Sequence, residues 1–348
     1  MKKLITAIIL TFATPSIAQN MLGSFFSNSN EGIAYFLPDT KINITVETSC
    51  VTQTPGEFYS YAERFLHIKS TIAEASNRWE ITGIECESEG VPCKEKYYTV
   101  KFGNNAASSI GLDGKGIIET INTTAPAKTD NTSVARQSTS KKTDASQYMT
   151  EEMLTATSTA KMAELTAKEI YAIRESKLAI TRGQAENMPS DGTAIALLLQ
   201  ELDKQEKALT EMFTGRTDTV YHTYRLTIAP NELRDTTKAV LLRFSHKLGV
   251  VDKENLAGEP VYYNFKDLKT VEQPIADEKK KQDGVCYNIP GRARFEVYTR
   301  TRTFIEKEIA IAQLGIVEIL SKSLFSKSNA VKVLFDTATG GIISIKKD

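Results

Sequence analysis

A two-residue alternation of apolar and polar side chains recurs at both ends of the chain and constrains its fold more than any other feature. In residues 41–47 (KINITVE), Ile42, Ile44 and Val46 alternate with polar neighbours, and residues 219–228 (TVYHTYRLTI) repeat the alternation. Successive side chains of a strand point to opposite faces, so this period is typical of a strand with one buried face. We therefore expect antiparallel β structure in both the first and the last third.

Two more stretches of the last third have strand character. Residues 292–302 (RARFEVYTRTR) place Ala293, Phe295 and Val297 on one face and mostly arginines on the other. The arginine face is typical of a solvated sheet surface, and the alternative is a surface that meets an acidic partner or a polysaccharide. Residues 331–347 (VKVLFDTATGGIISIKK) are expected to form a hairpin around the Gly-Gly pair.

The middle of the chain changes to the helical period. Residues 158–214 are predicted to form two long helices, the second of which ends at Gly215. The apolar faces consist of Ala163, Ala167, Ile170, Tyr171 and Leu178 in the first helix and of Ala194, Leu198, Leu202, Leu209 and Met212 in the second. A shorter amphipathic helix is expected over residues 55–67, opened by Pro55.

These patterns predict an α+β fold with two β-rich antiparallel domains and a long antiparallel helical hairpin between them. The expected divisions are a signal peptide (1–18), an N-terminal β-rich domain with one short helix (19–122), a flexible linker (123–148), the helical hairpin (149–216) and a C-terminal antiparallel β domain (217–348). The linker is predicted because its small polar side chains cannot bury enough surface to offset the entropy of ordering it.

The first 18 residues are typical of a secretory signal peptide. Lys2 and Lys3 precede an apolar stretch over residues 4–12, and a small-x-small site ends at Ala18. We expect cleavage after Ala18 and a periplasmic or outer-membrane-associated mature chain without a transmembrane segment, because no later run of about 18 apolar residues occurs. The alternative is a buried N-terminal helix.

Four cysteines, Cys50, Cys86, Cys93 and Cys286, are present in a chain that we expect to be exported. Export permits disulfides, and three pairings of four cysteines are possible. We favour Cys86–Cys93, which brackets a short Gly/Pro loop and could contribute roughly 2 to 3 kcal/mol by loop entropy. Free buried thiols are the alternative, and a metal site is not expected because the cysteine spacing does not match one.

No residue is predicted to be catalytic, and no cofactor is expected. The chain lacks the sequence motifs of serine hydrolases, P-loop proteins, zinc peptidases and EF-hands. His67, His222 and His246 are scattered, so structural roles are favoured for them. A pair of carboxylates from distant segments remains open, since such pairs meet only in the fold. The 43 basic and 43 acidic residues balance, which argues against nucleic-acid binding.

Aromatic side chains offer a possible carbohydrate surface. The candidates are Tyr59, Tyr61, Tyr97, Tyr98, Tyr262, Tyr263 and the single tryptophan, Trp79. Most of them alternate with apolar neighbours, which is typical of cross-strand packing rather than of stacking on a sugar. Both interpretations stay open at this point.

Two cations interrupt the apolar face of the first long helix. If the helices fold back about Asn187, Arg174 lies opposite Glu201, and we predict a structural ion pair between them that fixes the register. The alternative is an anion-binding site formed by Arg174, Lys177 and Arg182.

A set of segments resembles one known family. The segments are FLPDTKINITVE (36–47), PGEFYSYAERFL (55–66), LDGKGIIETIN (112–122), the helical stretch 173–215, LLRFSHKLGVV (241–251), IAIAQLGIVEIL (309–320) and FDTATGGIISI (335–345). Together they resemble domain-of-unknown-function family 4831, whose members are exported proteins of Bacteroides-type bacteria. The resemblance implies an envelope or periplasmic location, and it implies no activity and no catalytic residues.

Three functions are compatible with these patterns. The leading hypothesis is a non-catalytic envelope protein that binds another envelope protein or a second copy of itself, because long helices with apolar faces must bury them. The second is a binding protein for a glycan or peptide, with its ligand in a cleft between domains. The third is a hydrolase that uses two carboxylates.

Overall fold

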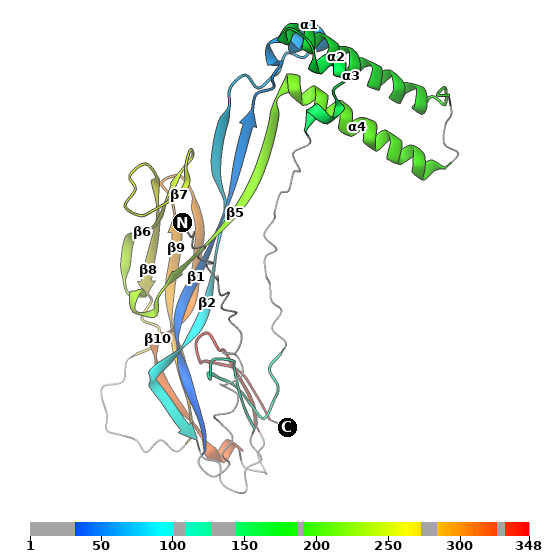
Figure 1. Ribbon diagram of the computed structural model, residues 1–348. Helices are drawn as coiled ribbons and strands as arrows, with labels where there is room; N and C mark the ends of the chain where they lie inside the picture. Colours follow the sequence, from blue (N-terminus) through cyan, green and yellow to red (C-terminus); the bar gives the residue numbers. More distant parts are fainter. Residues whose placement is uncertain are drawn as a thin grey trace, which may run out of the picture.

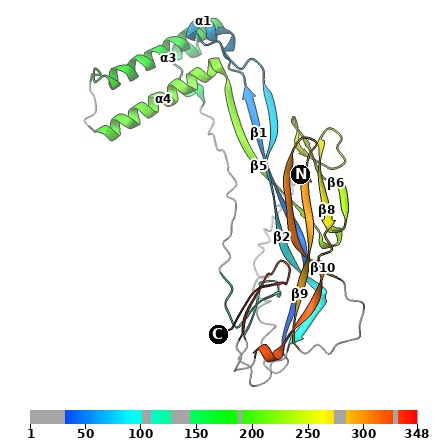
Figure 2. The same cartoon turned by 180° about the vertical axis from the view of Figure 1, so that it is seen from behind.

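The protein is an elongated β body from one end of which two long helices project (Figures 1 and 2). The computed structural model describes residues 32–100, 109–126, 144–186, 191–272, 284–325 and 331–347. Within these ranges the strands form three antiparallel sheets.

The strands are ordered as follows. The three-stranded sheet has the order β2-β1-β5, with β1 (Ile33–Thr54), β2 (Ser76–Val100) and β5 (Arg216–Ile228). The five-stranded sheet has the order β10-β9-β8-β6-β7, with β6 (Thr236–Ser245), β7 (Gly249–Val251), β8 (Glu259–Asp267), β9 (Gly284–Tyr298) and β10 (Thr303–Ser321). The four-stranded sheet has the order β12-β11-β4-β3, with β3 (Ile110–Leu112), β4 (Ile118–Ile121), β11 (Val331–Phe335) and β12 (Ile342–Lys347).

The helices are mostly gathered at one end of the three-stranded sheet. They are α1 (Ala62–Leu66), α2 (Glu151–Leu154), α3 (Thr159–Thr181) and α4 (Gly192–Thr214). Short 3₁₀ turns are η2 (Tyr59–Tyr61), η3 (Ala145–Tyr148), η4 (Pro230–Glu232) and η5 (Lys322–Phe325).

The main core lies between the three-stranded and the five-stranded sheets. On β1 the alternating residues Ile42, Ile44 and Val46 are fully buried, and on β9 Phe295 and Val297 are fully buried in the same apolar cluster. The alternation in these segments therefore arises as expected, because each strand packs one of its faces against the opposite sheet.

A polar junction joins the three sheets. Asn288 of β9 is 1% exposed, and its amide donates to the carbonyl of Pro38 (3.1 Å) on β1 and of Thr339 (2.7 Å) beside the four-stranded sheet. Gln313 of β10 pairs with the backbone of Thr40 in both directions, each bond 2.9 Å long. Buried polar groups that are fully paired in this way specify one arrangement of the sheets.

The predicted fold class was wrong. Strands dominate the described chain, and β1 from the first third pairs along β5 from the last third, with Ile44 opposite Leu226. The four-stranded sheet likewise pairs β4 with β11. The two ends of the chain therefore share sheets, and the helices lie at the end of the three-stranded sheet rather than as a hairpin between two domains. A local alternation shows which face of a strand is buried but does not identify its hydrogen-bonding partner.

Two of the predicted segments lie wholly or mostly outside the residues that the structure describes. The signal peptide (1–18) lies wholly outside the described residues, and so does most of the predicted linker (123–148).

Glu89 forms a surface ion cluster that predicts a pH effect on stability. Its carboxylate accepts from Lys115, from Asn43 (2.5 Å) and from Lys41 (3.1 Å). The hydrogen bond from Lys115 in particular lowers the pKa of Glu89 to about 2. A carboxyl whose pKa is lowered on folding stabilises the protein above its unfolded pKa of about 4.3, and this contribution is lost as the pH falls towards 2.

We expect Glu89→Gln to lower the free energy of unfolding by about 1 kcal/mol at neutral pH, because the cluster is partly solvated. The difference from the wild type should shrink between about pH 4.5 and 2, where the wild-type carboxyl becomes protonated. Urea denaturation at a series of pH values measures it, with the exposed Glu74→Gln as control. An equal difference at neutral and acid pH would contradict the cluster's role.

Candidate functional site

Helices α3 and α4 form a projecting unit that we call the arm. Each begins with a side-chain cap: Ser158 accepts from the backbone of Lys161 (3.2 Å), and Asp191 accepts from that of Thr193 (3.1 Å). Gly215 follows α4 with a positive φ of 78°, which favours glycine. Both views show the helices running side by side away from the sheets (Figures 1 and 2).

The base of the arm is anchored to the end of the three-stranded sheet. Phe213 of α4 is fully buried, and its ring centre lies 5.3 Å from that of Phe58. The backbone of Phe58 donates to the carbonyl of Met212 (2.7 Å), and that of Ile72 donates to Thr214 (2.9 Å). Burial and hydrogen bonds together fix the direction in which the arm leaves the body.

An ion cluster joins the two helices halfway along the arm. Arg174 Nε lies 2.6 Å from Glu206 Oε1, and Lys177 Nζ lies 2.8 Å from Glu206 Oε2 and also binds Asp203. Burial acts against the charge of Glu206, but the hydrogen bonds from Lys177 and Arg174 outweigh it and lower the pKa of this carboxyl. The cluster holds the register of the arm.

The structure brings Arg174 to Glu206 instead of the predicted Glu201. Glu201 accepts from Lys204 (3.1 Å) on its own helix and faces the hydroxyl of Tyr148 (3.5 Å). The five-residue difference corresponds to about 7.5 Å along a helix. Helix α3 ends at Thr181 and α4 begins at Gly192, so a count that assumes a tight turn at the predicted pivot does not give the register. The predicted pivot, Asn187, lies outside the described residues.

The three cations of the predicted anion site are not equivalent. Arg174 and Lys177 are engaged with carboxylates, as described above. Arg182 is the C-cap residue of α3, and its side chain is exposed. Within the described part of the chain it forms no ion pair. Arg182 is also absent from the groove that the other two line.

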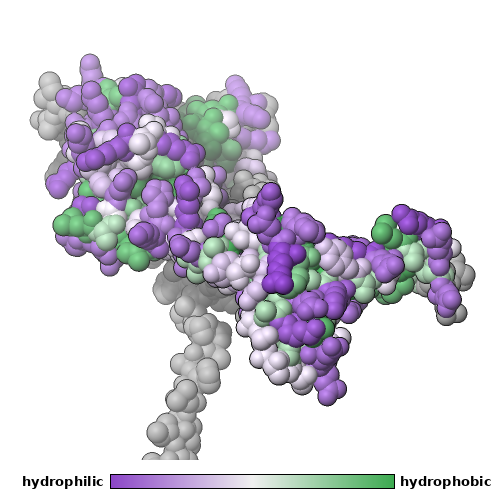
Figure 3. All heavy atoms as spheres, turned by 90° about the horizontal axis from the view of Figure 1, so that it is seen from above, coloured by the Kyte–Doolittle hydropathy of each residue, from purple (hydrophilic) through white to green (hydrophobic). Residues whose placement is uncertain are grey.

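Beyond the ion cluster the arm carries an apolar surface. Leu178 of α3 is 50% exposed, and Leu197 and Leu198 of α4 are 64% and 40% exposed. A groove of about 540 Å³ between the helices is lined by Leu178, Leu199 and the side chains of the ion cluster. Figure 3 shows hydrophobic residues near the far end of the arm. This far half contrasts with the base, where the apolar side chains are buried.

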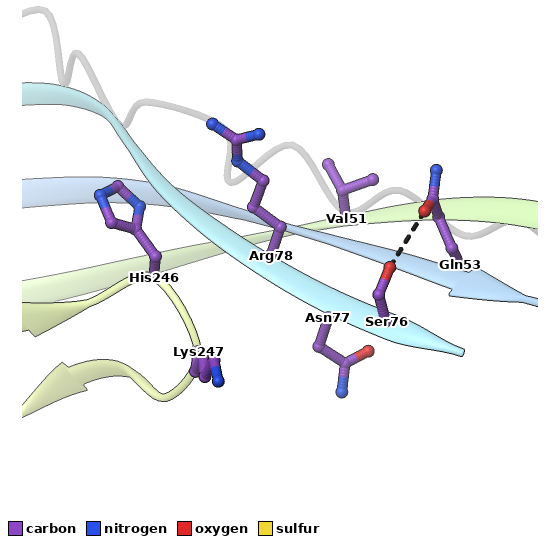
Figure 4. A pocket seen from close by; sticks show the side chains of 7 residues that line it. All are labelled: Val51, Gln53, Ser76, Asn77, Arg78, His246 and Lys247. Carbon is purple, nitrogen blue, oxygen red and sulfur yellow. Dashed lines mark hydrogen bonds between the residues drawn. The ribbon is translucent and has the colours of Figure 1, made fainter. Parts of the chain in front are cut away.

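A second hollow lies where the three-stranded sheet leaves the five-stranded sheet. It measures about 580 Å³ and is lined by Val51, Gln53, Ser76, Asn77, Arg78, His246 and Lys247 (Figure 4). We call it the neck pocket. Three segments that are distant in the sequence contribute to it, so local patterns gave no sign of the pocket as a unit.

Trp79 positions His246, one of the residues that line the neck pocket. Its backbone N–H donates to the carbonyl of His246 (2.8 Å), and its own carbonyl lies 3.0 Å from His246 Nδ1, which must donate because a carbonyl only accepts. The indole packs 4.9 Å from the ring of His222 and closely over Gly249. Trp79 is therefore packed between neighbours rather than free for a sugar to stack on.

The side chains of the other two predicted ligand surfaces partly contact one another or neighbouring side chains of the protein. Tyr97 is 51% exposed but its ring contacts that of Phe36 at 5.0 Å. In the arginine row, Arg292 and Arg294 both face Glu308, at 3.8 and 3.9 Å. These contacts favour packing and a mixed-charge sheet face over a dedicated ligand surface.

The predicted Cys86–Cys93 disulfide is not formed, and all four cysteines are free thiols. Strand β2 runs without interruption through both positions. Seven residues of extended strand span about 23 Å, whereas a disulfide needs Cα atoms within about 7 Å. The Gly/Pro stretch between them belongs to this strand and does not form the predicted loop. Burial raises the pKa of the thiols of Cys86 and Cys93.

A carboxylate pair was the third alternative. A hollow of about 440 Å³ includes Asp235 and Glu296. Asp235 accepts from the backbone of Asp267 (2.7 Å), and Glu296 accepts from the amide of Asn264 (2.7 Å). Both acids thus hold neighbouring strands together, and this geometry does not favour a catalytic pair.

In the described ranges no group of three or more His, Cys, Asp or Glu side chains is arranged to hold a metal ion. Of the helices in the described chain, none is long and apolar enough to cross a membrane.

Comparison with known proteins identifies a family. A family model for a domain of unknown function, DUF4831, matches residues 31–343. Neither the curated proteins nor the solved structures gave a match. Because the model covers most of the sequence and almost all of the described fold, the chain belongs to the DUF4831 family.

Proposed function

We propose that this protein is an exported, non-catalytic interaction protein of the bacterial cell envelope that binds a protein partner through the far half of its arm. The observation that carries the proposal is the exposure of Leu178, Leu197 and Leu198 on an anchored pair of helices. Contiguous exposed apolar surface marks interaction sites, whereas single exposed apolar side chains are ordinary.

The fixed arrangement of the two arm helices supports a role in binding. The ion cluster at Glu206 and the buried base around Phe213 hold the helices, so little ordering entropy is lost when a partner binds. An amphipathic helix surface presents apolar side chains three to four residues apart to a groove or to another helix. The partner is therefore expected to offer an apolar, largely uncharged protein surface.

Export is the second part of the proposal and rests on residues 1–18. If the chain is exported, the mature protein isolated from the envelope fraction begins at Gln19, which intact-mass measurement detects. A protein that keeps Met1 and stays in the cytoplasm would overturn this part while leaving arm binding to be judged alone.

The variant Leu197→Glu combined with Leu198→Glu tests the binding surface. We expect the affinity for the partner to fall at least tenfold, because two charges would have to be desolvated in the interface. The complex is measured in envelope extracts by size-exclusion chromatography with light scattering. The matched control is Leu256→Glu, at an 81% exposed leucine of the body. Equal behaviour of both variants would contradict the proposal.

A further inference from the structure

We propose that the neck pocket is a second binding site, independent of the arm, for a phosphate group carried on a polar scaffold such as a sugar. The pocket of about 580 Å³ lies within the usual size range of small-molecule sites. Among the described residues no carboxylate lines it, whereas Arg78, His246 and Lys247 all do. The site thus presents donors and positive charge to a ligand.

The basic side chains of the pocket are not neutralised by any carboxylate in the described part of the chain. Among the ion pairs of the described residues none involves Arg78, His246 or Lys247. The whole chain has 43 basic and 43 acidic residues, so this local excess does not follow from an overall basic composition. Unpaired cations around one hollow attract an anion.

The arrangement of donors suits a tetrahedral oxyanion. Figure 4 shows Arg78, Ser76, Gln53 and Val51 on the same side of the sheet, with His246 above the adjoining turn. The guanidinium of Arg78 offers a planar fork that matches two phosphate oxygens.

The rest of the wall is polar and partly preorganised. Ser76 donates to the side-chain oxygen of Gln53 (3.0 Å), and Asn77 and Lys247 complete the lining. Amide and hydroxyl groups of this kind can bind the hydroxyls of a sugar.

His246 has a defined role in this geometry. Its Nδ1 is committed to the carbonyl of Trp79, which leaves Nε2 as an acceptor in the neutral ring. Nε2 can therefore donate to an oxyanion only when the ring is protonated. On the side of the sheet that carries Ser76 and Gln53 the permanent charge is that of Arg78, because Figure 4 shows Lys247 on the opposite side of β2.

Trp79 is the only tryptophan of the chain and directly follows Arg78. Its backbone N–H and its backbone carbonyl both form hydrogen bonds with His246. Its emission therefore reports on Arg78 and His246, two of the residues that line the pocket. We expect glucose 1-phosphate to change this emission saturably, with glucose giving no change at the same concentrations. Arg78→Gln should weaken the response at least tenfold, and Arg78→Lys should weaken it less.

Controls separate the outcomes. Arg300→Gln, in the exposed turn after β9, should bind as the wild type does. Vesicles containing phosphatidic acid, followed by co-sedimentation, distinguish a lipid headgroup from a soluble sugar phosphate as the source of the phosphate. Circular dichroism confirms that each variant folds. If neither probe binds, or if Arg78→Gln binds as tightly as Arg300→Gln, the proposal is overturned, and the arm proposal is unaffected.

Discussion

Replacing Asn288 with aspartate is expected to remove at least 3 to 5 kcal/mol of folding free energy, a large part of the roughly 5 to 15 kcal/mol typical of a folded protein. The Asn288 amide is buried and donates to the carbonyls of Pro38 and Thr339. Aspartate has no donor when ionised, so a buried charge would face two carbonyl oxygens with no partner. All three sheets meet here, and the loss should therefore affect the whole body.

Urea denaturation followed by the Trp79 emission measures this loss. The control is Asn231→Asp at an exposed position of η4, which should change stability by no more than about 0.5 kcal/mol. If Asn288→Asp were as mild as the control, the polar junction would not be what holds the sheets together.

Replacing Phe213 with alanine is expected to cost about 3 to 5 kcal/mol, and the loss should be confined to the helical end. The side chain is fully buried against Phe58 and belongs to an apolar cluster that is separate from the two clusters of the body. A part of a protein with its own core can unfold on its own. The arm should therefore melt before the sheets do.

Two probes distinguish this local loss from global unfolding. Far-ultraviolet circular dichroism follows the helices, and the Trp79 emission follows the neck and body. In Phe213→Ala the helical transition should move to lower urea while the Trp79 transition stays in place. Leu197→Ala, at an exposed position of the same arm, is the control. Coincident shifts of both probes would show that the arm and the body unfold together.

The sequence predicted local structure better than it predicted how the segments are assembled. Ile42, Ile44 and Val46 are buried on one face of a strand, as their alternation indicated, because that pattern depends only on which face meets the core. The pairing of β1 with β5 depends on segments about 180 residues apart, and no local period encodes it. The predicted Cys86–Cys93 loop was wrong for a similar reason: its glycine and proline lie within one long, irregular strand.

For the candidate sites, too, the sequence indicated local features but not which segments come together. The unusual position of Arg174 and Lys177 within an apolar face was visible in the sequence, and both side chains do meet acidic residues of the second helix. Which acidic residue they meet depends on the connection between the helices, and the sequence does not specify it. The neck pocket combines residues near positions 52, 77 and 246, so only the packing of the two sheets creates it.

Contact between the far half of the arm and a protein partner can be detected by site-specific photocrosslinking in living cells. A photoreactive residue is placed at Leu197 in one variant and at Leu256 in another, since both side chains are well exposed. The account predicts a discrete crosslinked adduct of higher mass from position 197 and none from position 256. Adducts of equal yield at both positions, or none at position 197, would contradict it.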